Sequence, residues 1–296
     1  AEMNIIKNRF KFFAVSVVLI VCGLAAMVIN SSKGNGIFNF DIEFTGGTEM
    51  TVAVGDVPND DIAAVIKDIT GQSNPQVQRL VGTDNVSIKM QSVDGETRTK
   101  IADTLKEKFS LADDAVLNVQ DISGTISGEM QKTAAVAVLI ACVAMLIYIT
   151  IRFMDFKMGL SSILALVHDV LIMLAFYAIF RVPVNNSFIA ALLTVLGYSI
   201  NATIVIFDRI RENKKLMRRV TTQEIINTSV MQTMRRSIYT SLTTLFAIGA
   251  VYVFGVQSVR EFALPMMVGI ISGAYSSVFL SGSFWYTFIG GGKASK

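Results

Sequence analysis

Residues 182–207 read VPVNNSFIAALLTVLGYSINATIVIF, 26 consecutive residues without a charged side chain. An α-helix needs about 20 mostly apolar residues to cross the hydrocarbon core of a bilayer. Five other stretches of the chain are long and apolar in the same way. They are 12–29, 133–151, 158–180, 237–259 and 262–292, and only 158–180 is interrupted by ionisable residues, His168 and Asp169. The sequence therefore predicts a polytopic α-helical membrane protein with six transmembrane helices.

The composition agrees with this prediction. Of the 296 residues, 52% are apolar and only 17% are charged, whereas a soluble domain is about a quarter charged. A soluble protein with a buried helical core is the alternative, but soluble helices carry a charged face. The first stretch can also be read as a cleaved signal peptide, although residues 28–30 lack the small-residue cleavage pattern. Cys22 and Cys142 lie inside predicted helices and indicate neither a disulfide nor a metal site.

A polar segment, residues 31–132, separates the first two predicted helices. It holds nine basic and 16 acidic residues, a net charge of −7, against +10 for the rest of the chain. The predicted elements are a strand over 40–54 with a bend at Gly46 and Gly47, a helix from Pro58 to Gly71, strands over 76–81 and 86–91, a helix over 96–109 and a strand over 115–122. This βαββαβ order is typical of a ferredoxin-like α+β domain. The segment has no cysteine, histidine or nucleotide loop, which favours a non-enzymatic domain.

The basic residues predict the orientation of the chain. With the N-terminus in the cytoplasm, 15 Lys and Arg residues fall in cytoplasmic connections and two, Arg181 and Arg260, fall outside. The predicted organisation is a cytoplasmic N-terminus and first helix (1–30), an extracytoplasmic domain (31–132), five helices with a basic cytoplasmic loop at 208–236 (133–292), and a cytoplasmic tail (293–296). Nucleic-acid binding is an alternative role for the basic loop, but such loops more often set topology and contact anionic lipid.

Asp169 is the one acidic residue deep inside a predicted span, and His168 beside it is the only histidine. An ionisable residue at that depth is a functional candidate by default. Three interpretations compete: a proton carrier, a hydrogen-bonding group that holds helices together, and half of an aspartyl protease pair. The protease needs two carboxylates close together, and the spans offer no second one. A serine protease that uses His168 needs a recognisable nucleophile, and none stands out.

The neighbouring spans offer partners and packing signals. Thr194, Gly197, Asn201 and Asp208 recur at helical spacing and share one face, so we expect that face to meet Asp169. His168 should not share the face of Asp169, because adjacent residues lie about 100° apart on a helix. Gly269 and Gly273 form a GxxxG pattern, which lets helices approach closely.

Three stretches together resemble a known family. They are 40–47 (FDIEFTGG), 166–172 (LVHDVLI) and 197–213 (GYSINATIVIFDRIREN). The first resembles the opening motif of the exported domain in the SecD/SecF protein-export family, and the other two resemble motifs of its SecF branch. The six-span layout and the length are also similar, so the resemblance covers essentially the whole chain. It places the chain in the resistance-nodulation-division superfamily.

The resemblance implies a transport role rather than an enzyme. Such a subunit acts with SecD and the SecYEG translocon in the bacterial inner membrane. It uses the proton gradient, with protons as the coupling ion and no cofactor or metal, to pull preproteins outward after SecA has driven them through. YajC and YidC are further implied partners, together with the lipid bilayer, and no nucleic acid is implied.

The resemblance also implies roles for particular residues. The family's intramembrane aspartate corresponds to Asp169, and its functional positions near the fourth span correspond to Asn201 and Arg209. Thr194 is a further proton-pathway candidate because it shares the helix face of Asn201. Two other sets follow from the motifs: Asp41, Gly46 and Gly47 in the exported domain, and Asp208, Arg211, Glu212 and Asn213 at the end of the fourth span. This chain has Ala202 where many members carry Asp, which puts in doubt any mechanism that needs a second acid in this subunit.

Two other functions remain open at this point. One is a scaffold that stabilises SecD and docks other membrane proteins without conducting protons. The other is a self-contained exporter of small molecules or lipids from the same superfamily. Such pumps usually contain two six-span halves, whereas this chain has one.

Overall fold

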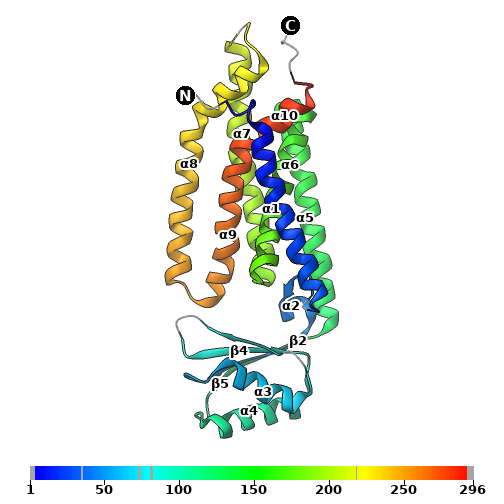
Figure 1. Ribbon diagram of the computed structural model, residues 1–296, viewed down its shortest axis with the longest axis vertical. Coiled ribbons are helices and arrows are strands. Elements are labelled where there is room, and N and C mark those ends of the chain that lie inside the picture. Colours follow the sequence, from blue (N-terminus) through cyan, green and yellow to red (C-terminus); the bar gives the residue numbers. More distant parts are fainter. Residues whose placement is uncertain (1–3, 35, 73–74, 81–82, 218, 292–296) are drawn as a thin grey trace. The chain divides into compact units, whose positions relative to one another are not determined.

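Six helical segments of the structure are long and apolar enough to cross a membrane, as the sequence predicts. The structure is a computed structural model and describes residues 4–34, 36–72, 75–80, 83–217 and 219–291. The segments are α1 (Arg9–Ser32), α5 (Gly124–Phe153), α6 (Phe156–Phe180), α7 (Asn186–Leu216), α8 (Thr222–Phe254), and a sixth built from α9 (Gln257–Tyr275), the π-helix η1 (Ser276–Ser281) and α10 (Gly282–Phe288) (Figure 1). The chain divides into unit 1, Ala1–Asn39 with Val136–Lys296, and unit 2, Phe40–Ala135.

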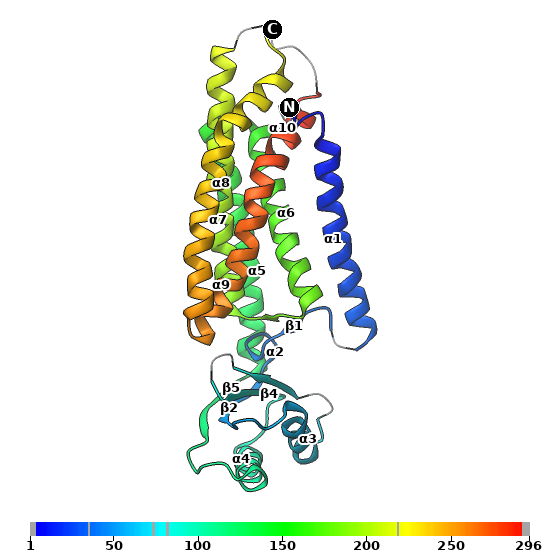
Figure 2. The same cartoon turned by 60° about the vertical axis from the view of Figure 1, so that its left-hand side comes forward.

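In unit 1, α6, α7 and α9 form the buried centre of the helix bundle. α9 packs against α6, α7 and α8, while α1 packs against α6, so that α1 lies on one side of α6 and α7 to α9 lie on the other (Figure 2). α1 approaches α6 closely at Gly23, where an added Cβ would lie 2.2 Å from the Cβ of Ala175. Together with η1 and α10, the central helices carry most of the buried polar side chains of unit 1, which directs the search for a site to them.

The connections of unit 1 differ from the sequence prediction in two places. The span predicted from residue 182 begins at Asn186, because Pro183–Val184 forms a short strand, β6, and the Asn185 side chain caps α7 by accepting from the N–H of Phe188. The basic segment 208–236 was predicted as a loop, and that is wrong for most of its length. α7 continues to Leu216 and α8 begins at Thr222, because Lys and Arg are good helix formers and do not end a helix.

Unit 2 has a four-stranded antiparallel sheet with strand order β3-β4-β2-β5. Its elements are α2 (Ile42–Thr45), β2 (Gly47–Ala53), α3 (Asn59–Thr70), β3 (Gln76–Arg79), β4 (Asn85–Met90), α4 (Gly95–Phe109) and β5 (Val116–Ile122), after the two-residue strand β1 (Asn39–Phe40). The core forms where Val52 and Ile88 of the sheet pack with Ile66 of α3 and Leu105 of α4. The strand predicted over 40–54 is wrong in its first half, where Asp41 caps the helical turn α2.

Candidate functional site

Asp169, on α6, is fully buried, and its carboxylate joins three helical segments. Oδ2 accepts hydrogen bonds from the hydroxyls of Ser199 on α7 at 2.6 Å and Ser276 on η1 at 2.8 Å. Oδ1 accepts from the hydroxyl of Ser272 on α9 at 2.7 Å. Sequence reasoning did not identify these three serines as partners of Asp169. Ser272 and Ser276 could have been found, because with Gly269 and Gly273 they form a stripe of small residues on one face of a helix.

The two glycines of α9 set the distance between α9 and α7. A Cβ on Gly269 would lie 2.5 Å from Val195, and a Cβ on Gly273 would lie 3.0 Å from the Cβ of Ser199. The GxxxG pattern therefore forms a helix contact within this chain. It lets α9 approach α7 closely enough for Ser199 and Ser272 to reach the same carboxylate. Beyond Ser276 the helix continues as a π-helix, a local geometry often found at functional sites.

The chemistry of the site follows from its donors. In the described part of the chain, no Lys or Arg lies within ion-pair distance of Asp169. A serine hydroxyl is both a donor and an acceptor. Three hydroxyls can donate to a carboxylate, and any one of them can rotate to accept from a carboxylic acid; the Ser276 hydroxyl also lies 3.4 Å from the carbonyl oxygen of Gly273. The hydroxyls of the site can therefore hydrogen-bond Asp169 in either protonation state.

His168 contacts Asp169 directly, although adjacent residues do not share a helix face. Its Nδ1 lies 3.1 Å from Oδ1 of Asp169. The angle between adjacent residues applies to their Cβ directions, but the imidazole reaches back to the neighbouring carboxylate. The order of groups is not that of a Ser-His-Asp hydrolase, in which the serine bonds the imidazole. Here the three serines bond the carboxylate.

The structure does not bring the predicted partners on α7 to Asp169. Thr194, Gly197 and Asn201 are exposed and lie on the outer face of α7, and the Thr194 hydroxyl bonds the carbonyl of Ala190. The expectation that this face meets Asp169 is wrong. Ser199 lies two residues from Asn201, about 200° around the helix, so the face that meets Asp169 is the opposite one.

The signature residues at the end of α7 form a network that ties neighbouring helices together. Arg152 of α5 binds both carboxylate oxygens of Asp208, at 3.0 and 3.2 Å, and the Arg211 side chain donates to the main-chain oxygen of Arg152 at 3.4 Å. Arg209 donates to Gln232 of α8 and to Glu212, and the Asn213 amide donates to Ser229 and Gln232. Arg209 is ten residues beyond Ser199, about 15 Å along the helix, so it is remote from Asp169.

In unit 2 the motif Asp41, Gly46 and Gly47 builds a turn. Oδ1 of Asp41 accepts from the N–H of Ile42 at 2.6 Å, and Oδ2 accepts from Nζ of Lys89 at 2.5 Å. Gly47 has φ +145° and lies so close to β4 that a Cβ would sit 2.4 Å from the carbonyl oxygen of Met90. Gly46 has φ +73°, which is also a backbone conformation that favours glycine.

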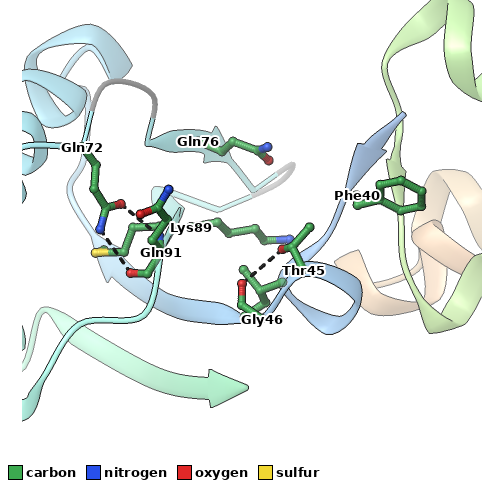
Figure 3. A pocket seen from close by; sticks show the side chains of 9 residues that line it. Phe40, Thr45, Gly46, Gln72, Gln76, Lys89 and Gln91 are labelled. Atoms are coloured by element: carbon green, nitrogen blue, oxygen red, sulfur yellow. Dashed lines mark hydrogen bonds between the residues drawn. The ribbon is translucent and has the colours of Figure 1, made fainter. Parts of the chain in front are cut away.

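This turn borders a groove of about 550 Å³. Its lining is Phe40, Ile42, Thr45, Gly46, Gln72, Gln76, Lys89, Met90 and Gln91. Figure 3 shows the Gln72 carboxamide bonded to the main chain of Gln91: its Oε1 accepts from the N–H at 2.9 Å and its Nε2 donates to the carbonyl at 3.3 Å. Among the described residues, no group of three or more His, Cys, Asp or Glu side chains could hold a metal ion.

Comparison with protein families matches residues 100–290 to the model described as protein export membrane protein SecD/SecF, C-terminal. The SecF protein translocase subunit of Acidaminococcus fermentans is 36% identical over 97% of this chain and 97% of that protein. The SecF subunit of Sebaldella termitidis is 36% identical over 96% of this chain and 91% of that protein.

A fused protein gives the structural comparison. The SecDF translocase subunit of Thermus thermophilus is 33% identical over 94% of this chain, which covers 38% of that protein. A crystal structure of SecDF from Thermus thermophilus, described as a translocon-associated membrane protein, superposes with a TM-score of 0.84 at 31% identity over 98% of this chain and 39% of that one. The match covers both units of the chain.

Proposed function

The chain belongs to the SecD/SecF family of protein-export membrane proteins, and we propose that it acts with SecD and the SecYEG translocon in the bacterial inner membrane. In this role it is a transport subunit and not an enzyme. It uses the proton gradient to promote late steps of preprotein translocation. Both termini are cytoplasmic, and unit 2 is the ferredoxin-like domain on the outer side, where the preprotein emerges.

The observation that carries the proposal is the bonding of Asp169. The carboxylate is fully buried and is satisfied by hydroxyls on three helical segments. Because those hydroxyls accommodate both protonation states, the proton is the part of the site that can change. Loss or gain of that proton alters the charge that holds α6 to α7, α9 and η1, which couples protonation to helix packing.

The energy available is sufficient for such coupling. One elementary charge that crosses 100 mV releases about 2.3 kcal/mol. Because about 1.4 kcal/mol corresponds to a tenfold change in an equilibrium constant, each proton can shift a two-state equilibrium by a factor of tens.

The outer face of α7 supports SecD as the partner. Thr194 and Asn201 are polar and exposed on a helix that is apolar enough to span a membrane. Polar side chains in a bilayer are normally turned toward protein or a water-filled cavity. This chain covers only 38% of the fused SecDF relative. The remaining part of that protein includes its SecD half, which is available to cover this face of α7.

The test is Asp169→Asn in the full chain, reconstituted with SecD and the translocon in vesicles. We expect the variant to assemble with SecD but to lose the stimulation of export by a proton gradient, because a carboxamide does not take up or release a proton near neutral pH. Proton flux measured with a trapped dye should fall with it. Asp68→Asn, at an exposed carboxylate on α3, is the matched control and should behave as wild type.

Two outcomes decide against the proposal. Normal gradient-dependent export by Asp169→Asn contradicts the proton-carrier role. If the variant instead loses assembly with SecD, and wild type shows no proton flux with or without SecD, then Asp169 is a packing group in a scaffold subunit. Flux by the chain without SecD would favour a self-contained exporter.

A further inference from the structure

Only one of the two ring nitrogens of His168 has a hydrogen-bond partner within the described ranges. The residue is 7% exposed, and its Nδ1 bonds Oδ1 of Asp169. Its Nε2 is buried and has no hydrogen-bond partner among the residues that the structure describes. A buried ring nitrogen without a partner destabilises the fold, so its presence beside the one deep carboxylate calls for a role.

A line of polar groups continues from His168 toward α1. The ring of Tyr275 on α9 lies 6.1 Å from the imidazole ring, centroid to centroid. Its hydroxyl donates to the carbonyl of Phe12 on α1 at 2.9 Å. Ser16 lies one helical turn beyond Phe12 and is 5% exposed, and its side chain interacts with that of Tyr275. Tyr275 thus interacts with α1 through Phe12 and Ser16 and faces the imidazole of His168 on α6.

The charged and titratable groups around the imidazole are few. The segments packed against this part of α6 are 12–29, 186–207 and 262–288, and their sequences contain no Asp, Glu, Lys or Arg. The titratable groups beside the imidazole are Asp169 on its own helix, at hydrogen-bond distance, and Tyr275 on α9, whose ring centroid lies 6.1 Å from that of the imidazole. α1, α7 and η1 contribute the hydroxyls of Ser16, Ser199 and Ser276. No ion pair therefore competes with Asp169 for the imidazole.

We propose that His168 is the proton-relay residue through which Asp169 is loaded and unloaded from the α1 side, past Ser16 and Tyr275. This inference rests on the proposed function. In the starting state the neutral imidazole donates its Nδ1 proton to the Asp169 carboxylate, and Nε2 is bare. A proton that arrives at Nε2 gives an imidazolium, which passes the Nδ1 proton to Oδ1. The products are a neutral carboxylic acid and a neutral imidazole protonated at Nε2, and the reverse path restores the starting tautomer.

The geometry favours this side over α7. Ser199, Ser272 and Ser276 enclose the carboxylate on the side of α7 and η1. The polar residues on the outer face of α7, Thr194 and Asn201, have the helix between them and Asp169. The imidazole is the one group in direct contact with the carboxylate that has an unused nitrogen within the described part of the chain.

The test compares proton uptake after a pH jump, with full-length protein and SecD in vesicles that contain a trapped pH-sensitive dye. His168→Asn keeps a donor near the position of Nδ1 but has no second nitrogen to relay through. We expect uptake to slow by about a hundredfold or more, the usual contribution of a positioned general acid–base group, and the inflection of the pH–rate profile due to the imidazole to disappear. Ser16→Ala and Tyr275→Phe leave every bond to Asp169 intact, and each should slow uptake about threefold.

The matched control is Ser162→Ala, a fully buried serine on α6 whose hydroxyl bonds the carbonyl of Met158; its uptake should equal wild type. Uptake by His168→Asn at the wild-type rate, with Asp169→Asn inactive, overturns the relay and leaves the proposed function standing. Normal uptake by Asp169→Asn overturns the proposed function itself. If His168→Asn fails to assemble with SecD, the Ser16→Ala/Tyr275→Phe double variant decides: a slowed rate supports the relay and an unchanged rate overturns it.

Discussion

Two carboxylates, Asp41 in unit 2 and Asp169 in unit 1, are almost equally buried, at 5% and 0% exposure, but their partners differ. Asp41 bonds the ammonium group of Lys89 and one main-chain N–H. Asp169 bonds three serine hydroxyls and an imidazole, and none of these carries a fixed charge. The two sites therefore bond the same chemical group differently: one with a cation, the other with groups that carry no fixed charge.

The difference separates a structural carboxylate from a switchable one. The ammonium group of Lys89 lies 2.5 Å from the carboxylate of Asp41 and 3.8 Å from that of Glu49, so ion pairs hold this part of unit 2 together. Hydroxyls beside Asp169 serve the charged and the neutral form alike. Asp41 therefore fixes the turn that starts β2, whereas the hydroxyl partners of Asp169 can bond either form of its carboxyl group.

The largest expected effect comes from removing the cation. Lys89→Met leaves Asp41 buried and unpaired, and the free energy of unfolding of unit 2 should fall by about 3–5 kcal/mol. Hydrogen exchange of the β2 and β4 amides in the full-length protein measures this loss. The double variant Asp41→Asn/Lys89→Met should recover most of it, since no buried charge then lacks a partner. Equal losses in the single and double variants would show that Lys89 acts through packing rather than through charge.

Removing the hydroxyls one at a time should have a smaller effect. Ser199→Ala, Ser272→Ala and Ser276→Ala each remove one of several donors, and each should lower the free energy of unfolding by about 1 kcal/mol. A second substitution should cost more than the first, because the remaining donors are then too few for the charged carboxylate. Unfolding in detergent measures the series. The control is Ser283→Ala, at a buried serine of α10 that donates to the carbonyl of Phe279 on η1. Strictly additive losses, each equal to that of the control, would show that the three serines do not act together on Asp169.

The sequence predicted the six spans and most elements of unit 2 because their signals are long or repeated. A run of 26 uncharged residues such as 182–207 has few structural alternatives. Asp169 was also identified, because a lone deep acid is conspicuous. What could not be read was the rotation of α7. Both of its faces are uncharged, so hydropathy gave no reason to choose the buried face of Ser199 over the exposed face of Asn201.

Short-range chemistry accounts for the other errors. The alternating pattern at 40–54 hid the helical turn α2, which depends on one side-chain bond from Asp41 to the N–H of Ile42. The basic segment 208–236 looked like a loop because of its charge, but the charges pair across helices, as Arg152 and Asp208 do. Such contacts depend on tertiary packing and leave no periodic trace in the sequence.

Asp94 extends the comparison to an exposed carboxylate, where the expected effect is smallest. It caps α4 by accepting from the N–H of Thr97 at 2.8 Å. The Thr97 side chain, together with that main-chain N–H, holds the pKa of the Asp94 carboxyl below its ordinary value. A lowered pKa in the folded state means that Asp94 adds stability at pH values above its unfolded pKa, and that this contribution is lost as the pH falls through the folded pKa. Asp94→Asn keeps a capping oxygen but no charge, so the first turn of α4 should exchange its amides slightly faster than wild type at pH 7, and the two should become equal once the pH lies below the lowered folded pKa of Asp94. Asp103→Asn, in the middle of the same helix, is the control. A difference between Asp94→Asn and wild type that persists at low pH would show that the charge of Asp94 is not what stabilises the cap.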